Sequence, residues 1–324
     1  MDEYFDIKQA AIMLRKVMGE RLPKSEGHAV SKHLATFKCN GLVVKKFTDP
    51  KSWRIVKAST SGDTCEELVL TMQGVLGDIN LPPLSSTEIP RVHRIAFLRQ
   101  HVGLIGLGTP EFSTYTDKML EVFQMISASM PEGYLQPWSP TQLNNHYQIN
   151  AHSRYFTSEK EAKNLDAIPF SSLVDPTGVL GRMASRDFVH TIDNEVQYLI
   201  YTNRDGVSRY DPIDPAIFRT GDIVEIQFTV MAIPLRGIEQ AKPLVILRAL
   251  TLVDNSFSKE AYLKRAKAAI KPVKEPTVTL KLRRKVGYDD EEQDVRQSRH
   301  AIASLNLEDA KGAQGKQDIT MNEI

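Results

Sequence analysis

The amino-acid sequence predicts an α+β protein, with helices in the N-terminal half, an antiparallel β-rich meander or partial barrel at 195–253, and a disordered C-terminal tail. Three observations favour this fold class. Two long β-rich runs lie between Phe218 and Phe257. Segments nearer the N-terminus carry apolar residues at helical spacing. After Pro272 the hydrophobic periodicity ends and charged residues dominate.

The first β-rich run, Ile223 to Ile233, alternates apolar and polar side chains after the turn Gly221-Asp222. This period of two is typical of a strand with one buried face. A second run, Leu244 to Val253, follows a polar loop at 235–242. We therefore expect the two runs to pair as an antiparallel hairpin in the core.

The charged residues of this hairpin need an explanation. Asp222 and Glu225 are three positions apart, so a regular strand places them on opposite faces and they cannot act as a carboxylate pair. We expect Asp222 to bind backbone N–H groups of its turn and Glu225 to face solvent. Arg248 lies in an apolar strand, where a buried guanidinium needs a carboxylate or a ligand phosphate. We prefer a structural ion pair for it.

Two further strands are predicted before the central hairpin. Glu195 to Tyr201 alternates its side chains, and Asn203 to Gly206 has the residues of a hairpin turn. The chain then returns through Val207 to Tyr210. With the central hairpin, these strands give four consecutive β elements.

Apolar spacing predicts four helices. They span residues 2–18, the segment from Thr64 to Gly77, residues 117–130 and residues 259–270. Thr64 and Glu67 match the S/T-x-x-E capping box at the start of the second helix. Gly19 is placed to end the first.

Between the first two helices the sequence predicts β structure. Asn40-Gly41 is a strong hairpin signal, with strands expected at 34–38 and 42–47. Residues 53–58 could add a third strand. Residues 91–103 alternate basic and apolar side chains, which fits a partly buried strand or a short helix.

Length and composition are those of an ordinary globular protein. The chain has 324 residues, of which 41% are hydrophobic and 25% charged. The net charge of +1 argues against a uniformly basic nucleic-acid binder but allows a local basic patch. We expect an α+β part at 1–133, a β-rich domain packed with it at 134–270, and a disordered charged tail at 271–324.

The expected location is intracellular, nuclear or cytoplasmic. Cys39 and Cys65 lack metal-ligand spacing, so we expect free thiols in a reducing compartment. The charged N-terminus does not resemble a signal peptide. No apolar window is long enough to predict a membrane span.

The sequence contains no P-loop, strand-linked GxGxxG, GxSxG or HExxH motif. The alternative to a non-enzymatic protein is a non-haem iron oxygenase on a double-stranded β-helix, with Fe²⁺ held by His190, Asp193 and one of His146 or His152. Two histidines and one carboxylate are the ligands of such a site. The spacing His-x-x-Asp counts against it, because a regular strand would place these two side chains on opposite faces.

Residues 134–155 are rich in aromatic, basic and amide side chains, and we expect them to form an ordered loop. Stacking faces interleaved with cations could bind a single-stranded nucleic acid. We prefer packing in the core for most of them. The interleaved residues are Tyr134, Trp138, His146, Tyr147, His152, Arg154 and Tyr155.

The predicted tail carries a basic block followed by an acidic block. The basic residues are Lys281, Arg283, Arg284 and Lys285. Such a short cluster can contact nucleic acid or a nuclear import receptor. The acidic block runs from Asp289 to Asp294, and blocks of this kind usually serve as solvated interaction segments.

Four phrases together resemble a large group of proteins from mushroom-forming (basidiomycete) fungi. That group also has a Lys-Arg-Lys-Val-Gly-Tyr-like stretch and an acidic tail, here Arg284 to Glu292. The resemblance covers roughly residues 134 to 292 and implies no activity, fold or catalytic residue. The phrases are His146 to His152, Asp175 to Leu180, His190 to Val196, and Phe218 to Gln227 with Leu244 to Asp254.

A weaker resemblance is to the β-barrel modules of chromatin readers. The entry strand of these modules often begins with Gly-Asp before apolar alternation, as Phe218 to Val224 does.

Taken together, the sequence predicts a non-enzymatic intracellular protein, with the nucleus as the preferred location. It would bind an unidentified macromolecular partner, protein or nucleic acid, and no membrane.

Overall fold

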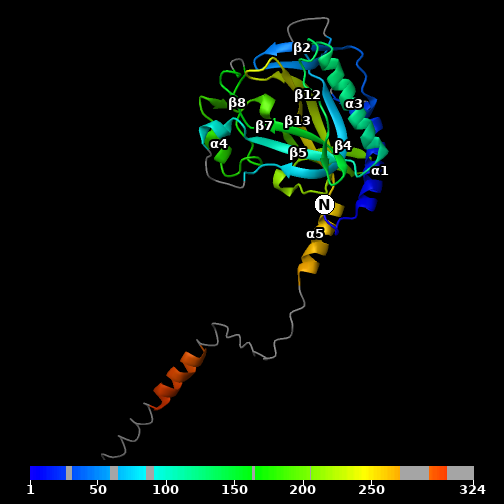
Figure 1. The fold of residues 1–324 in the computed structure, drawn as a ribbon. Helices are drawn as coiled ribbons and strands as arrows, with labels where there is room; N and C mark the ends of the chain where they lie inside the picture. The colour runs from blue at the N-terminus through cyan, green and yellow to red at the C-terminus, as the bar shows by residue number, and fades with distance from the viewer. Residues whose placement is uncertain are drawn as a thin grey trace, which may run out of the picture. The chain divides into compact units, whose positions relative to one another are not determined.

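The computed structural model describes residues 1–26, 31–58, 65–84, 91–162, 165–204, 206–270 and 292–304. Residues 1–270 form one compact unit and residues 271–324 a second. The first unit is built on an 11-stranded sheet (Figure 1). In the second unit, residues 292–304 are helical.

Five strands of the sheet close into a barrel, in the order β4-β5-β7-β13-β12 and back to β4. Every neighbouring pair is antiparallel except β7 and β13, which run parallel. The strands are β4 (Val69–Asn80), β5 (Arg99–Ile105), β7 (His146–Arg154), β12 (Ile223–Pro234) and β13 (Ala241–Asp254). This connectivity is that of the OB-fold, a five-stranded, partly open Greek-key barrel.

The remaining strands extend the barrel at its edges. β3 pairs with β12 and β2 with β3, while β10 pairs with β13 and β11 with β10. β1 pairs with β4, β6 pairs with β7, and β8 and β9 form a separate small sheet. Their bounds are β1 (Ser31–His33), β2 (Leu42–Thr48), β3 (Lys51–Lys57), β6 (Thr141–Leu143), β8 (Thr157–Ser158), β9 (Phe188–Val189), β10 (Gln197–Arg204) and β11 (Val207–Pro212).

Helices α1 and α3 cover one side of the barrel (Figure 1) and are joined by an ion pair between Arg15 and Glu111. The α-helices are α1 (Ile7–Glu26), α2 (Val92–Ile95), α3 (Pro110–Ser127), α4 (Val179–Met183) and α5 (Ser256–Ala269). Short 3-10 helices are η1 (Leu34–Thr36), η2 (Ile192–Asn194) and η3 (Pro215–Ile217). No helix among the described residues is long and apolar enough to cross a membrane.

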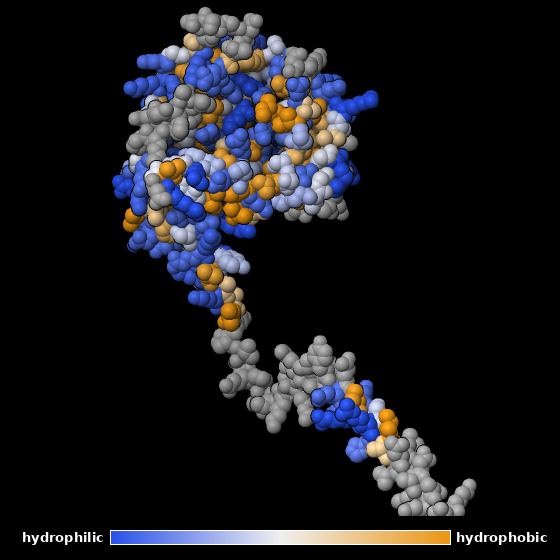
Figure 2. Space-filling model, turned by 180° about the vertical axis from the view of Figure 1, so that it is seen from behind, coloured by the Kyte–Doolittle hydropathy of each residue, from blue (hydrophilic) through white to orange (hydrophobic). Residues whose placement is uncertain are grey.

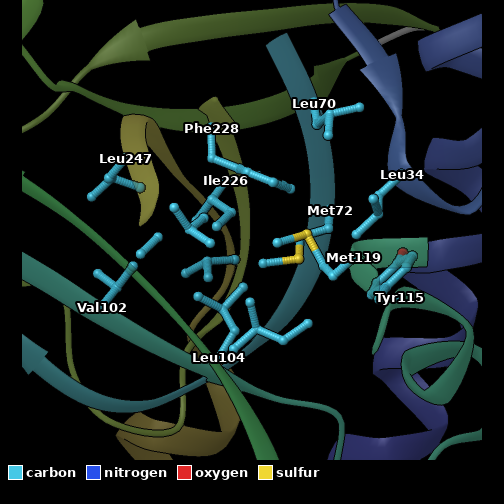
Figure 3. Close-up of a cluster of buried hydrophobic side chains, with 14 of the residues drawn as sticks. Leu34, Leu70, Met72, Val102, Leu104, Tyr115, Met119, Ile226, Phe228 and Leu247 are labelled. Carbon is cyan, nitrogen blue, oxygen red and sulfur yellow. The ribbon is translucent and has the colours of Figure 1, made fainter. Parts of the chain in front are cut away.

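The main core fills the barrel and continues under α3. Alternate side chains of β12 and β4 point inward, so Ile226 lies opposite Met72 and Phe228 opposite Leu70 (Figure 3). A smaller core packs outside it, and its buried residues are Ile95, Tyr155, Phe156, Val179, Leu180 and Met183. Apolar side chains at the end of α5 remain exposed (Figure 2), with Ile270 at 74%.

The predicted fold class is confirmed, and so is the central hairpin of β12 and β13. β10 and β11 also form the expected hairpin. Of the two arrangements expected at 195–253, the partial barrel is confirmed and the meander was wrong, because β10 pairs in parallel with β13 and β11 lies at the end of the sheet. The division expected at 133/134 falls inside the first compact unit, since both halves contribute strands to the barrel.

The helix predicted from Thr64 to Gly77 was wrong, because this segment enters β4. Leu70 and Met72 point into the barrel opposite Phe228 and Ile226, an arrangement that the sheet imposes on residues whose spacing also fits a helix. The hairpin at Asn40-Gly41 was wrong as well. Residues 34–36 form η1, and β2 pairs with β3 across the next turn.

Several predicted helices exist with different bounds. α1 continues past Gly19, which has open space around it and a helical backbone. α3 begins at Pro110, in the first helical turn where proline is favoured. The region expected to be an ordered loop at 134–155 contains β6 and β7.

Asp222 behaves as predicted, since its Oδ2 accepts from the Arg219 backbone N–H at 2.8 Å. The expectation for Glu225 was wrong, because this side chain is only 4% exposed. Its Oε2 accepts from Nε of Arg21 on α1 at 2.8 Å and from Nε2 of Gln73 at 2.7 Å. The Tyr115 hydroxyl donates to the amide oxygen of Gln73 at 2.8 Å. This buried network attaches α1 and α3 to the outside of β4 and β12.

Candidate nucleic-acid interface

The outer face of β5 and β7 is polar. Side chains of directly opposed residues in an antiparallel pair lie on the same face, and the opposed pairs on this face are His101 with His152 and Gly103 with Asn150. The pairs between them, such as Val102 with Ala151, are fully buried in the barrel. The alternation therefore separates an apolar inner face from a polar outer one.

Three cations surround His152 on this outer face. Arg99 and Arg154 lie opposite each other at the ends of β5 and β7, and both are exposed. Lys242 approaches from β13, which pairs with β7 through Ile246 and His152. Within the described ranges, no acidic side chain forms an ion pair with any of the three cations. The face thus carries uncompensated positive charge.

His152 is electrically neutral in this setting. Burial and, after it, the positive charges of Arg99, His101, Arg154 and Lys242 together lower its pKa to about 4. Desolvation and like charge both disfavour the imidazolium form. At neutral pH His152 can donate and accept hydrogen bonds without adding to the repulsion among its neighbours.

A hydrogen-bonded cluster continues this face toward β6. Nε2 of His101 lies 3.2 Å from Oδ1 of Asn150, which also accepts from Nε2 of Gln148 at 2.7 Å. Nδ2 of Asn150 donates to the Thr141 hydroxyl at 2.7 Å. On the other side, Nδ1 of His101 lies 3.5 Å from a carboxylate oxygen of Asp78. Donors and acceptors for a ligand are therefore present beside the cations.

Gly103 leaves room for this cluster. A Cβ atom at this position would lie 2.1 Å from Oδ1 of Asp78 and 2.4 Å from Nε2 of Gln148. The amide and carboxylate groups therefore fold across the glycine backbone at the middle of the face.

Two loops border the face. The loop between β4 and β5 carries Phe97, which is 72% exposed, and the exposed cations Arg91 and Arg94. The loop between β12 and β13 carries the exposed Arg236 and Ile238. In an OB-fold, oligonucleotides bind on the face of the second and third strands and between these two loops. Here the second and third strands are β5 and β7.

Most of the interleaved aromatic residues pack in the core, as preferred from the sequence. Tyr155 is 1% exposed, Trp138 stacks on Phe123 with ring centroids 5.4 Å apart, and Tyr134 packs edge-on against Trp53. From that group, the binding face keeps His152 and Arg154. His146 begins the same strand, and Tyr147 is 56% exposed.

The four ligands of the iron hypothesis do not come together, which removes its basis. Nδ1 of His190 donates to the Tyr155 carbonyl at 2.8 Å, and its ring stacks on Phe170. Asp193 accepts from Arg54 at 3.0 Å. His146 and His152 lie six positions apart along β7. Among the described residues there is no group of three or more His, Cys, Asp or Glu side chains placed to hold a metal ion.

Arg248 forms the predicted structural ion pair. Its guanidinium lies 3.0 Å from a carboxylate oxygen of Glu67 and donates to the Asp193 carbonyl at 2.7 Å. Arg54 binds the carboxylates of both acids. The two arginines thus hold loops 65–68 and 190–195 against the barrel.

The basic block predicted to contact nucleic acid or an import receptor lies outside the described residues. Its members are Lys281, Arg283, Arg284 and Lys285. The residues that sequence analysis missed are Gln148, Asn150, His101 and Lys242, because only strand pairing brings them together. The available signals were the alternation of basic and apolar residues in 91–103 and the amide-rich composition of 134–155.

No protein-family model matches the chain, and no curated protein matches it. Among solved structures, the chain is similar to gp2.5, a single-stranded DNA binding protein encoded by bacteriophage T7, at 8% sequence identity and a TM-score of 0.27. The match covers 57% of this chain and 86% of that chain. A likeness of this size carries no argument about what the protein binds, so function has to be inferred from the connectivity and surface of the barrel.

Proposed function

We propose that residues 1–270 bind single-stranded nucleic acid across the outer face of β5 and β7. The observation that carries the proposal is a group of three cations that have no acidic partner among the described residues. Arg99 and Arg154 lie on β5 and β7, the strands that an OB-fold uses for this purpose, and Lys242 lies at the start of β13 beside them. Each of the three cations acts electrostatically on His152, so the positive charges are concentrated in one part of the face.

The arrangement suits a single strand better than a folded protein partner. Phosphates of the strand would neutralise the guanidinium and ammonium groups. Because these cations form no ion pair with an acidic side chain of the described residues, no existing ion pair has to be broken first. Nδ2 of Asn150 donates one of its two hydrogens to the Thr141 hydroxyl, and the other could be donated to a base edge. Phe97, exposed on the bordering loop, offers a ring on which a base can stack.

Fluorescence anisotropy with labelled oligo-dT of about 16 nucleotides, the upper site size of one such barrel, tests the proposal. We expect the double variant Arg99→Ala/Arg154→Ala to weaken binding by about tenfold or more, because two charge-assisted contacts are lost. The matched control is Arg204→Ala/Arg209→Ala, which removes the same charge from exposed positions of β10 and β11. Equal effects of the two double variants, or tighter binding of a duplex than of the single strand, would contradict the proposal.

We also propose that the protein acts in the nucleus. Support comes from the sequence of the basic block at 281–285, which fits an import receptor. Fluorescent fusions with and without residues 271–324 test this part. Nuclear accumulation that depends on 271–324 is expected, and the same cytoplasmic distribution of both fusions would argue against it.

A further inference from the structure

We propose that nucleic acid binding on this face is coupled to uptake of a proton by His152, so that the protein binds more tightly as the solution becomes more acidic. This inference rests on the proposed function and concerns regulation of the same site. It depends on where the histidine lies, which charges surround it, and what a phosphate would change.

His152 lies at the centre of the charged part of the face. Its cross-strand neighbour is His101 of β5, and its neighbour on the other side is Ile246 of β13. Arg99 of β5, Arg154 of β7 and Lys242 of β13 all act on it electrostatically. A strand that neutralises these cations must therefore pass close to the imidazole.

The surrounding charges are almost all positive. Three permanent cations and the second imidazole, His101, face His152 from β5, β7 and β13. The acidic group on this part of the face is Asp78 of β4, whose carboxylate is 3.5 Å from His101. In the free protein, burial together with this positive surrounding holds the pKa of His152 near 4.

A bound phosphate reverses the balance. It offsets the charges of Arg99, Arg154 and Lys242 and is itself a hydrogen-bond acceptor for a protonated imidazole. Burial, the largest cause of the lowered pKa, remains in the complex, so the pKa of His152 rises above about 4 but stays below the ordinary histidine value of about 6.5. Between these two values the complex binds more protons than the free protein, so a fall in pH favours the complex.

The size of the effect follows from linkage. One proton taken up changes the association constant by at most about tenfold for each pH unit. An ordinary histidine pKa in the complex sets the upper limit, at which acidification from about pH 7.5 to about pH 5.5 strengthens binding about tenfold. Oligo-dT is the suitable probe, because thymine does not titrate in this range.

The test is isothermal titration calorimetry of the full chain with oligo-dT at these two pH values and constant ionic strength. Buffers of different ionisation enthalpy report the number of protons taken up on binding. We expect proton uptake at the lower pH and binding that is tighter than at the higher pH, by up to about tenfold. The variant His152→Gln should lose most of the uptake and of the pH dependence, whatever its affinity at the higher pH.

Two further variants assign the effect. His101→Gln measures the share of the neighbouring imidazole, and His146→Gln, at the start of β7, is the matched control that should behave like the unmutated protein. Uptake that persists unchanged in His152→Gln overturns the inference, as does binding of the unmutated protein without any proton uptake. If oligo-dT fails to bind at both pH values, the proposed function fails, and this inference fails with it. A thermal melt of each variant at the higher pH shows that it is folded.

Discussion

At the scale of single residues, the ion pair between Arg21 and Glu225 has the largest expected effect on stability. Both side chains are less than a tenth exposed, and Glu225 also accepts from Gln73. Removing one partner leaves the other charge buried without its counterion, which typically costs about 3–5 kcal/mol. We therefore expect Arg21→Ala to lower the free energy of unfolding by that amount in urea denaturation.

The matched control is Arg15→Ala on the same helix. Arg15 also pairs with a carboxylate, that of Glu111, but its side chain is 58% exposed. Exposed pairs contribute about 0–1 kcal/mol. Similar losses in the two variants would show that burial of the Arg21 pair does not decide its contribution.

His152 also makes stability depend on pH. Its pKa is lowered in the folded protein to about 4, while the unfolded chain has the ordinary value of 6.5. The unfolded state therefore binds more protons between these two pH values. The contribution of His152 to the free energy of unfolding is complete above about pH 6.5 and is lost as the pH falls toward 4. The loss is at most about 3 kcal/mol.

Urea denaturation of the unmutated protein and of His152→Gln at several pH values measures this contribution. The unfolding free energy of the unmutated protein minus that of His152→Gln should fall by up to about 3 kcal/mol from neutral pH to about pH 4, because carboxylate titrations common to both cancel. A value that stays constant across this range would show that the pKa of His152 is the same in the folded and unfolded states.

At the scale of elements, two glycines of the β5 region differ in what surrounds them. A Cβ at Gly103 meets the mobile ends of Asp78 and Gln148, whereas a Cβ at Gly106 would lie 2.1 Å from Cβ and 2.3 Å from Cγ of the buried Phe112. Overpacking of a core costs about 1–3 kcal/mol. We expect Gly106→Ala to reach the upper part of that range in thermal unfolding and Gly103→Ala to stay below about 1 kcal/mol.

The binding assay should show the opposite order. Gly103→Ala displaces the side chains that cover the middle of the interface, so it should weaken binding of oligo-dT more than Gly106→Ala does at a temperature where both variants are folded. If Gly103→Ala binds normally, the hydrogen-bonded cluster of His101, Thr141, Gln148 and Asn150 does not contribute to the interface.

The same scale shows what could be predicted from the sequence. β12 and β10 have clear alternation, and a local pattern was enough to identify both. β4 was mistaken for a helix because its apolar residues fit both periods, and only pairing with β12 and β5 decides between them. Glu225 was assigned to solvent because nothing in its own strand indicates that α1 covers it.

The candidate interface was harder to predict for a related reason. Arg99 and Arg154 are far apart in the sequence and become neighbours only through the β5–β7 register. The sequence did identify His152 and Arg154 as residues that could contact nucleic acid, within a group whose aromatic members were mostly needed for packing. A motif search has no access to a surface that is assembled by strand order.

At the scale of the whole molecule, the protein combines a near-neutral net charge with a concentrated basic face. The net charge of +1 describes the whole chain, yet three cations act on one histidine. In the proposed complex, long-range attraction to nucleic acid would therefore be weak, and binding would depend on a few short-range phosphate contacts. The number of these phosphate contacts sets the expected salt dependence of binding.

Each phosphate neutralised on a single strand contributes a slope of about −0.7 to a plot of log association constant against log salt concentration. Contacts by Arg99, Arg154 and Lys242 therefore predict a slope of about −2 for the unmutated protein, and Arg99→Ala/Arg154→Ala should reduce it to about −0.7. Anisotropy titrations with oligo-dT over a range of salt concentrations measure both slopes. A much steeper slope that Arg99→Ala/Arg154→Ala leaves unchanged would place the phosphate contacts elsewhere on the chain, and a slope near zero would mean that the oligonucleotide is not held through its phosphates.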